Sequence, residues 1–193
     1  MLRTGRKWLA AFMLAALLAV PGVTWGAGFD YSGFNGELGV RFGYGKSTHK
    51  ADVHLYSLLP RWGIFLIRPG HTMLGGLSLS FVVEGILSVA QAEGDGAEVG
   101  FTPMLKVGLP LGRGAMLFLE GGAGIISESF NSPGVAHAFN FTPQIGGGLD
   151  IALMSRLGLT VAYRFRHSSN AGIYKENPAF NVNFFHAGLT YYY

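Results

Sequence analysis

Two residues near the C-terminus have the types and the spacing needed for ester hydrolysis. His167 and Ser169 stand two positions apart in the stretch YRFRHSSNAGIY, residues 163–174. In an extended strand both side chains lie on one face, with Cβ atoms roughly 6.5–7 Å apart. A serine hydroxyl is a weak nucleophile until a base removes its proton, and imidazole is the usual base. The pair therefore fits a nucleophile and its general base, although H-x-S alone also fits polar residues that end a strand.

The strand that would carry this pair has an unusual distribution of polarity. Apolar and aromatic residues precede His167 on its own face, whereas Arg164 and Arg166 point to the opposite face. A soluble sandwich or lipocalin-like barrel would turn the apolar face inward and the arginines to water. In an outer-membrane barrel the apolar face contacts lipid and the charged face fills the lumen. We favour the second arrangement for this chain.

The N-terminus predicts export. Arg3, Arg6 and Lys7 precede an apolar run and a small-residue site, which is the pattern of a cleavable signal peptide over residues 1–26. The mature domain is then 27–193. The signal carries three of the 14 basic residues and none of the 11 acids, which leaves the mature chain neutral and gives no support to nucleic-acid binding. The chain has no cysteine, so disulfides cannot stabilise it.

The mature chain contains short segments of alternating polarity separated by Gly, Pro, Asn and Asp. This alternation predicts eight strands: 35–47, 51–67, 76–92, 97–109, 114–127, 138–153, 157–169 and 182–193. We expect the second strand to bend or bulge within 58–63, because Pro60 cannot donate a ladder hydrogen bond. The fold prediction is all-β: an eight-stranded antiparallel transmembrane β-barrel, closed so that no strand edge meets lipid.

The polar faces of these segments support the barrel. Their charges are few and of both signs, as expected of a lumen in which they pair with one another: Glu37, Arg41, Glu84, Lys106, Glu120, Asp150, Arg164 and Arg166. We expect Arg164 and Arg166 to be satisfied by acids such as Glu120 or Asp150. The chain also ends in Tyr193 on an apolar face, which resembles the terminal strand of bacterial outer-membrane proteins. With both termini in the periplasm, the seventh strand delivers His167 and Ser169 to the extracellular end.

The stretch HSSNAGI, residues 167–173, followed by Asn177-Pro178, resembles the signature of the PagL-type lipid A 3-O-deacylases, also called the acyloxyacyl hydrolase family. The resemblance implies an eight-stranded barrel in the outer membrane of a Gram-negative bacterium. It implies Ser169 as nucleophile, His167 as general base and Asn170 as a residue that stabilises the oxyanion. It also implies lipid A of lipopolysaccharide as substrate, cleaved at the ester of the 3-position, with no metal or organic cofactor.

One position departs from the family pattern. Well-known members carry a Glu as third member of the triad, and Asn181 aligns with it here. An Asn carbonyl can accept the His Nδ1 proton and fix the tautomer, but it lacks the charge that stabilises an imidazolium. We favour Asn181 as the residue that orients His167, with Glu176 as the alternative. A non-catalytic outer-membrane barrel with a structural or adhesive role is the alternative function, and a homodimer is possible.

Overall fold

The structure is a computed structural model that describes residues 28–48, 52–70, 76–133 and 135–193. The predicted signal peptide, residues 1–26, and the start of the mature domain at residue 27 lie outside these residues. A short 3-10 helix, η1 (Tyr31–Gly33), precedes eight strands. In the described part of the chain, no helix is long and apolar enough to cross a membrane.

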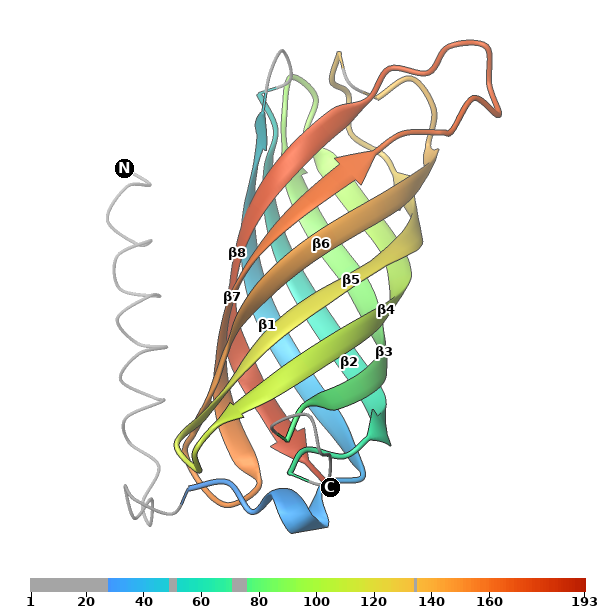
Figure 1. The fold of residues 1–193 in the computed structure, drawn as a ribbon. Coiled ribbons are helices and arrows are strands. Elements are labelled where there is room, and N and C mark those ends of the chain that lie inside the picture. The colour runs from blue at the N-terminus through green and yellow to red at the C-terminus, as the bar shows by residue number, and fades with distance from the viewer. Residues whose placement is uncertain (1–27, 49–51, 71–75, 134) are drawn as a thin grey trace, which may run out of the picture.

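The eight strands form a closed antiparallel barrel in which each strand pairs with its sequence neighbours and β8 returns to β1 (Figure 1). Their bounds are β1 (Gly36–Thr48), β2 (His54–Ile67), β3 (Ser78–Gln91), β4 (Gly96–Leu111), β5 (Ala115–Glu128), β6 (Phe139–Ala152), β7 (Leu157–Ser168) and β8 (Phe180–Tyr192). The predicted fold class and strand number are confirmed. In Figure 1 the C-terminus and η1 lie at the lower end, and the β7–β8 loop projects from the upper end.

The second strand differs from expectation. No bulge interrupts 58–63, because the ladder with β1 runs without a break and pairs Pro60 with Val40. The ring of Pro60 is accommodated by Gly85 on β3, where a Cβ would lie only 3.1 Å from Pro60 Cγ. The shift in register with β3 lies instead between Phe65 and Ile67, at the lower end of the strand. On the β3 side, Leu59 and Pro60 have no ladder partner, but the register is the same before and after them, so the proline interrupts this ladder without a bulge.

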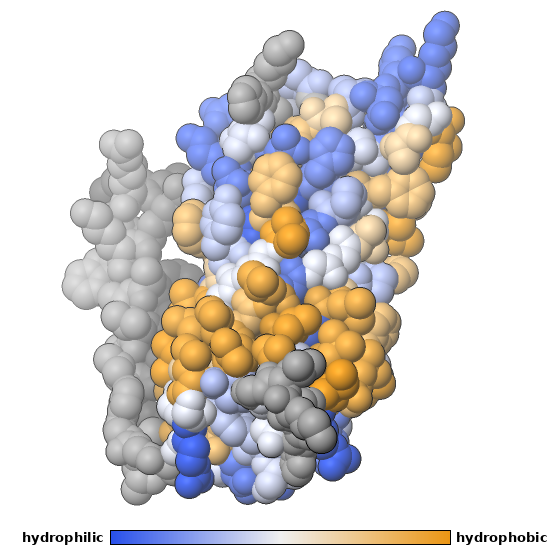
Figure 2. Space-filling view, viewed as in Figure 1, coloured by the Kyte–Doolittle hydropathy of each residue, from blue (hydrophilic) through white to orange (hydrophobic). Residues whose placement is uncertain are grey.

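Side chains alternate between the two faces of the barrel wall as the sequence predicts. The outward positions are large and apolar, among them Leu38, Phe42, Trp62, Leu105, Leu119, Ile145 and Phe185. Figure 2 shows the consequence: a belt of apolar residues crosses the lower middle of the visible surface, with hydrophilic residues at the lower rim and over most of the upper end. The inward positions carry the charged and hydroxyl side chains, which are buried.

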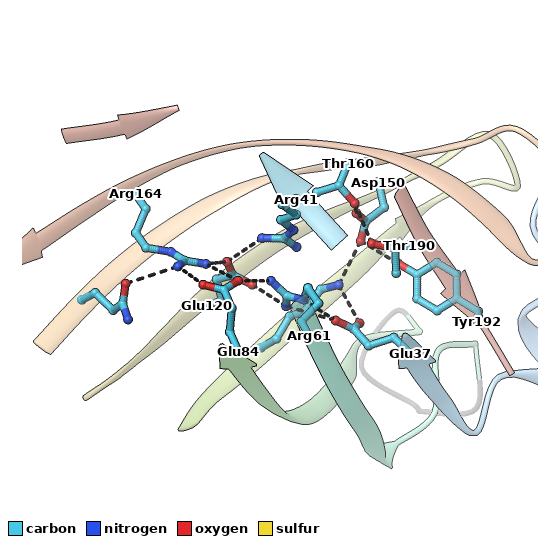
Figure 3. A network of polar contacts seen from close by, with 12 residues as sticks. Glu37, Arg41, Arg61, Glu84, Glu120, Asp150, Thr160, Arg164, Thr190 and Tyr192 are labelled. Atoms are coloured by element: carbon cyan, nitrogen blue, oxygen red, sulfur yellow. Dashed lines mark hydrogen bonds and ion pairs between the residues drawn. The ribbon is translucent and has the colours of Figure 1, made fainter. Parts of the chain in front are cut away.

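A network of ion pairs fills the middle of the lumen (Figure 3). Arg61 lies at its centre and reaches three carboxylates: Glu37 at 3.0 Å, Glu84 at 3.0 Å and Glu120 at 2.9 Å. Lys106 bonds both Glu37, at 2.8 Å, and Asp150, at 2.9 Å. Buried charges are tolerated only when they are paired in this way. The network thus pairs the buried charges of the lumen, using side chains from strands far apart in sequence.

The two arginines of β7 find different partners. Arg164 bonds Glu84 and Glu120. Glu120 is one of the two acids named in advance, and Glu84 is an additional partner. Arg166 is also satisfied by an acid, but by neither of the two named examples, Glu120 and Asp150. Both of its terminal nitrogens donate to Glu98 of β4, each at 2.8 Å. Arg166 stands one pleat nearer the upper end than Arg164, and the acid at its level is therefore a different one.

An aromatic cluster lies at the lower end, where the chain enters β1. Phe29 and Phe34 are buried and pack on Tyr192 of the last strand, with Phe34 stacked on Tyr192 at 4.3 Å between ring centroids. The backbone of this segment is held to the lower turns, since Phe29 N–H donates to Arg113 O at 2.7 Å. The segment before β1 therefore covers the lower end of the barrel.

Candidate active site

Strand β7 carries the predicted nucleophile and base to the upper end of the barrel. His167 is its penultimate residue, and Ser169 follows its last residue. Both are half-buried and belong to the outward series, while Ser168 and Asn170 between and after them are buried. The β-strand alternation alone thus separates two adjacent serines: Ser169 is presented on the outer wall, and Ser168 faces the lumen.

The imidazole of His167 links Ser169 to Asn181. Its Nε2 lies 3.1 Å from Ser169 Oγ, and its Nδ1 lies 2.7 Å from Asn181 Oδ1. An amide oxygen can only accept, so Nδ1 carries the proton and donates it to Asn181. Nε2 is then unprotonated and accepts from the Ser169 hydroxyl. This is the tautomer that a general base next to a serine nucleophile requires.

Asn181 owes its place to the ladder between the last two strands. His167 and Asn181 are direct Cα partners in the β7–β8 pairing, and Asn181 is also paired with Thr48 of β1. Cross-strand partners on one face have Cβ atoms about 4.5–5.5 Å apart, which suits a hydrogen bond between short polar side chains. Glu176, the alternative orienter, is exposed in the β7–β8 loop, and its carboxylate is not among the partners of His167.

The backbone around Ser169 is fixed on the other side by β6. Ser169 N–H donates to Phe141 O at 3.1 Å, and Phe141 N–H donates to Ser169 O at 2.8 Å. The chain turns sharply two residues later, where Ala171 adopts a φ of 54° and Gly172 a φ of 81°. A positive φ is uncommon for a residue with a Cβ, and such backbone is concentrated at functional sites.

Asn170 ties the start of the β7–β8 loop to its middle. Its side-chain Nδ2 donates to Glu176 O at 2.7 Å, and its Oδ1 accepts from Gly172 N–H at 2.9 Å. Its backbone N–H donates to Asn177 Oδ1 at 3.0 Å. One of the two Nδ2 hydrogens is used in this way, and the described residues offer no partner for the second.

Sequence reasoning assigned no role to Asn177 or Phe141, although both hold the segment that carries the predicted nucleophile. Asn177 precedes Pro178, and an Asn-Pro pair is a turn signal that could have marked it. Phe141 carried no local signal, because its bridge to Ser169 depends on how β6 and β7 are placed side by side. In the described residues no group of three or more potential metal ligands occurs.

Solved structures show the same architecture. The crystal structure of the outer membrane enzyme PagL is 20% identical to this chain, covers 78% of it and 97% of its own length, and has a TM-score of 0.57. The crystal structure of Neisserial surface protein A, from Neisseria, is 11% identical and covers 83% of this chain and 97% of its own, with a TM-score of 0.53. These likenesses show the fold. No curated protein sequence matches the chain.

The family model described as Lipid A 3-O-deacylase (PagL) matches residues 68–190, which is more than half of the chain. The matched region runs from the turn before β3 almost to the end of β8 and includes His167, Ser169 and Asn181. The resemblance noted in residues 167–173 is thus confirmed over a much longer stretch. This chain belongs to the lipid A 3-O-deacylase (PagL) family.

Proposed function

We propose that this protein hydrolyses the ester that links an acyl chain to the 3-position of lipid A, with Ser169 as nucleophile and His167 as general base. Membership of the lipid A 3-O-deacylase family and the outer-membrane barrel fold support the substrate and the location in the outer membrane. The single observation that carries the mechanism is the chain of contacts Ser169–His167–Asn181, at 3.1 Å and 2.7 Å.

The reaction follows from these contacts. Ser169 Oγ attacks the ester carbonyl while His167 Nε2 takes its proton, and the tetrahedral intermediate forms. Collapse breaks the bond to the sugar oxygen, which leaves with the proton from His167. Water then attacks the acyl-enzyme with His167 again as base, and the free fatty acid departs. Asn181 keeps the imidazole in the required tautomer throughout.

The oxyanion needs donors that are in place before the reaction. We propose Asn170 for this role, together with backbone N–H groups of the adjacent turn. Its support is its position directly after Ser169 and the second Nδ2 hydrogen described above. The bonds from Asn170 to Glu176, Gly172 and Asn177 would hold the turn in a fixed shape. A homodimer is a separate proposal, which cross-linking in intact outer membranes would test.

The test compares the two adjacent serines. Ser169→Ala and His167→Ala should reduce fatty-acid release from lipopolysaccharide by at least about 10³-fold. Ser168→Ala is the matched control, because Ser168 faces the lumen, where its Oγ lies 3.4 Å from Glu128 Oε1. It should retain activity, and all three variants should remain folded barrels that shift on gels after heating. Equal release by wild type and the Ser169→Ala variant would refute the mechanism.

A further inference from the structure

A row of aromatic side chains crosses the outer wall just below the catalytic residues. It consists of consecutive cross-strand partners on β7, β8, β1 and β2: Tyr163, Phe185, Tyr44 and Tyr56. The rings of Tyr163 and Phe185 lie 5.3 Å apart, and those of Tyr44 and Tyr56 lie 5.5 Å apart. Aromatic rings near strand ends are typical of the interfacial girdles of membrane barrels, and this row changes depth from one strand to the next because the strands are tilted (Figure 1).

The surface becomes polar immediately above this row. The next outward partners are Phe165, Asn183, Lys46 and His54, and above them come His167, Asn181 and Thr48. The catalytic imidazole therefore lies two outward positions above the aromatic row. Lys46 lies one outward position above the same row. Each therefore lies nearer the upper end than the aromatic residue of the row on its own strand.

Lys46 is exceptional among the cations of the barrel wall. The other lysines and arginines in the described strands point into the lumen and are at most 3% exposed: Arg41, Arg61, Lys106, Arg164 and Arg166. Lys46 points outward and is exposed. A cation on the lipid-facing side of a barrel is destabilising at the midplane and nearly neutral at the interface. Its position thus fits contact with headgroups and does not fit contact with acyl chains.

Lys46 is close enough to the catalytic residues to contact the same lipid molecule. Two strand spacings separate β7 from β1, which is about 10 Å, and Lys46 lies two residues, about 7 Å, below the row of His167 along the strand. The strands are tilted (Figure 1), so the displacement from β7 to β1 and the displacement of two residues along the strand change the depth in the membrane in opposite directions. The two changes largely cancel, and Lys46 and His167 lie at similar depths. The flexible lysine side chain covers part of the remaining lateral distance.

Among the residues that the structure describes, none forms an ion pair with Lys46, so its charge can meet a ligand. Its outward partner His54 is held between Tyr44 and Asp52, with Nδ1 2.7 Å from Tyr44 Oη and Nε2 3.3 Å from Asp52. The carboxylate of Asp52 therefore contacts His54. On the other side Lys46 is paired with Asn183, which accepts from Tyr163 Oη at 2.7 Å.

We propose that Lys46 binds a phosphate group on the sugar headgroup of lipid A and thereby places the ester against Ser169. This inference rests on the proposed function. Lipid A carries phosphate on the same small disaccharide that bears the ester, so one cation at this depth can fix the rotation of the headgroup. A lysine serves phosphate as a point charge, whereas an uncharged side chain of similar length cannot.

The test uses two variants and two substrates in micelles of a neutral detergent. Lys46→Gln should raise KM for phosphorylated lipid A about tenfold, as expected for loss of one charge-assisted contact, with little change in kcat. Lys46→Arg should restore it. On lipid A that has been enzymatically dephosphorylated, wild type and Lys46→Gln should be equal. Arg68→Gln, which removes an exposed charge in the β2–β3 turn at the lower end, should have no effect.

Binding provides a measurement that does not depend on catalysis. In the Ser169→Ala background, Lys46→Gln should weaken equilibrium binding of phosphorylated lipid A by a similar factor. If Ser169→Ala remained active, the proposed mechanism would fail. The comparison of binding with and without Lys46→Gln would still test the role of Lys46. An equal loss on both substrates would assign Lys46 a structural role and overturn the proposal. So would a loss that appears only when anionic phospholipid is added, because Lys46 would then bind a neighbouring lipid.

Discussion

His167 and Asn181 face one another across the β7–β8 ladder as direct Cα partners, with Nδ1 and Oδ1 2.7 Å apart. Two neighbouring strands therefore hold the proposed base and its proposed orienting residue, and no loop has to close to bring them together. A residue at 181 acts on the imidazole from a fixed position. The identity of that residue decides how well the charge formed on His167 is stabilised.

The first prediction concerns this charge. Asn181→Ala should lower kcat by about 10- to 100-fold, because the tautomer of His167 is no longer fixed. Asn181→Glu should raise kcat above the wild-type value, since a carboxylate also stabilises the imidazolium. The kcat of both variants is measured as the rate of fatty-acid release at saturating lipopolysaccharide. If wild type is inactive and Asn181→Glu is active, the native protein is the non-catalytic barrel considered as the alternative.

The second prediction concerns the side chain of Asn170. Asn170→Asp should lower kcat by about 10²–10³-fold with KM unchanged, because a carboxylate can donate neither to the oxyanion nor to Glu176 O. Asn177→Ala removes only the acceptor of the Asn170 N–H and should cost about tenfold or less. Single-turnover rates would measure both. Similar small losses in the two variants would show that Asn170 acts only by shaping the turn.

The third prediction concerns the lumen network. Arg61→Met should reduce the free energy of unfolding by about 3–5 kcal/mol, because three buried carboxylates lose a shared partner. Urea titration, followed by the heat-modifiable band on gels, measures this change. Arg68→Met is the control and should unfold at the wild-type urea concentration. A similar midpoint for both variants would mean that the remaining cations satisfy the acids.

The fourth prediction concerns closure between the first and last strands. A Cβ at Gly188 of β8 would lie 2.1 Å from Val40 O and 2.6 Å from the Arg41 Cα on β1. Gly188→Ala should therefore force the two backbones apart and reduce the yield of folded barrel. Gly114→Ala is the matched control, because a Cβ there meets nothing within 4 Å. Equal folding yields for the two variants in the presence of membranes would contradict this reading of the seam.

Alternation of polarity was sufficient to predict the faces of the wall and the strand ends to within three residues. It also placed Asn181 on the face of His167, because parity within a strand survives any choice of register. Register and stagger were not predictable from single strands. For that reason Glu98 was not named as the partner of Arg166, and the central role of Arg61 and the bridge from Phe141 to Ser169 were missed.

The proposed catalytic residues lie on the outer wall, while side chains fill the lumen. In the proposed mechanism, substrate therefore arrives by lateral diffusion within the leaflet, and neither substrate nor product passes through the barrel. The relevant concentration is a surface density, so the rate should follow the mole fraction of lipid A in the leaflet. Dilution of the bulk suspension should leave that rate unchanged, and crowding by other lipids should lower it.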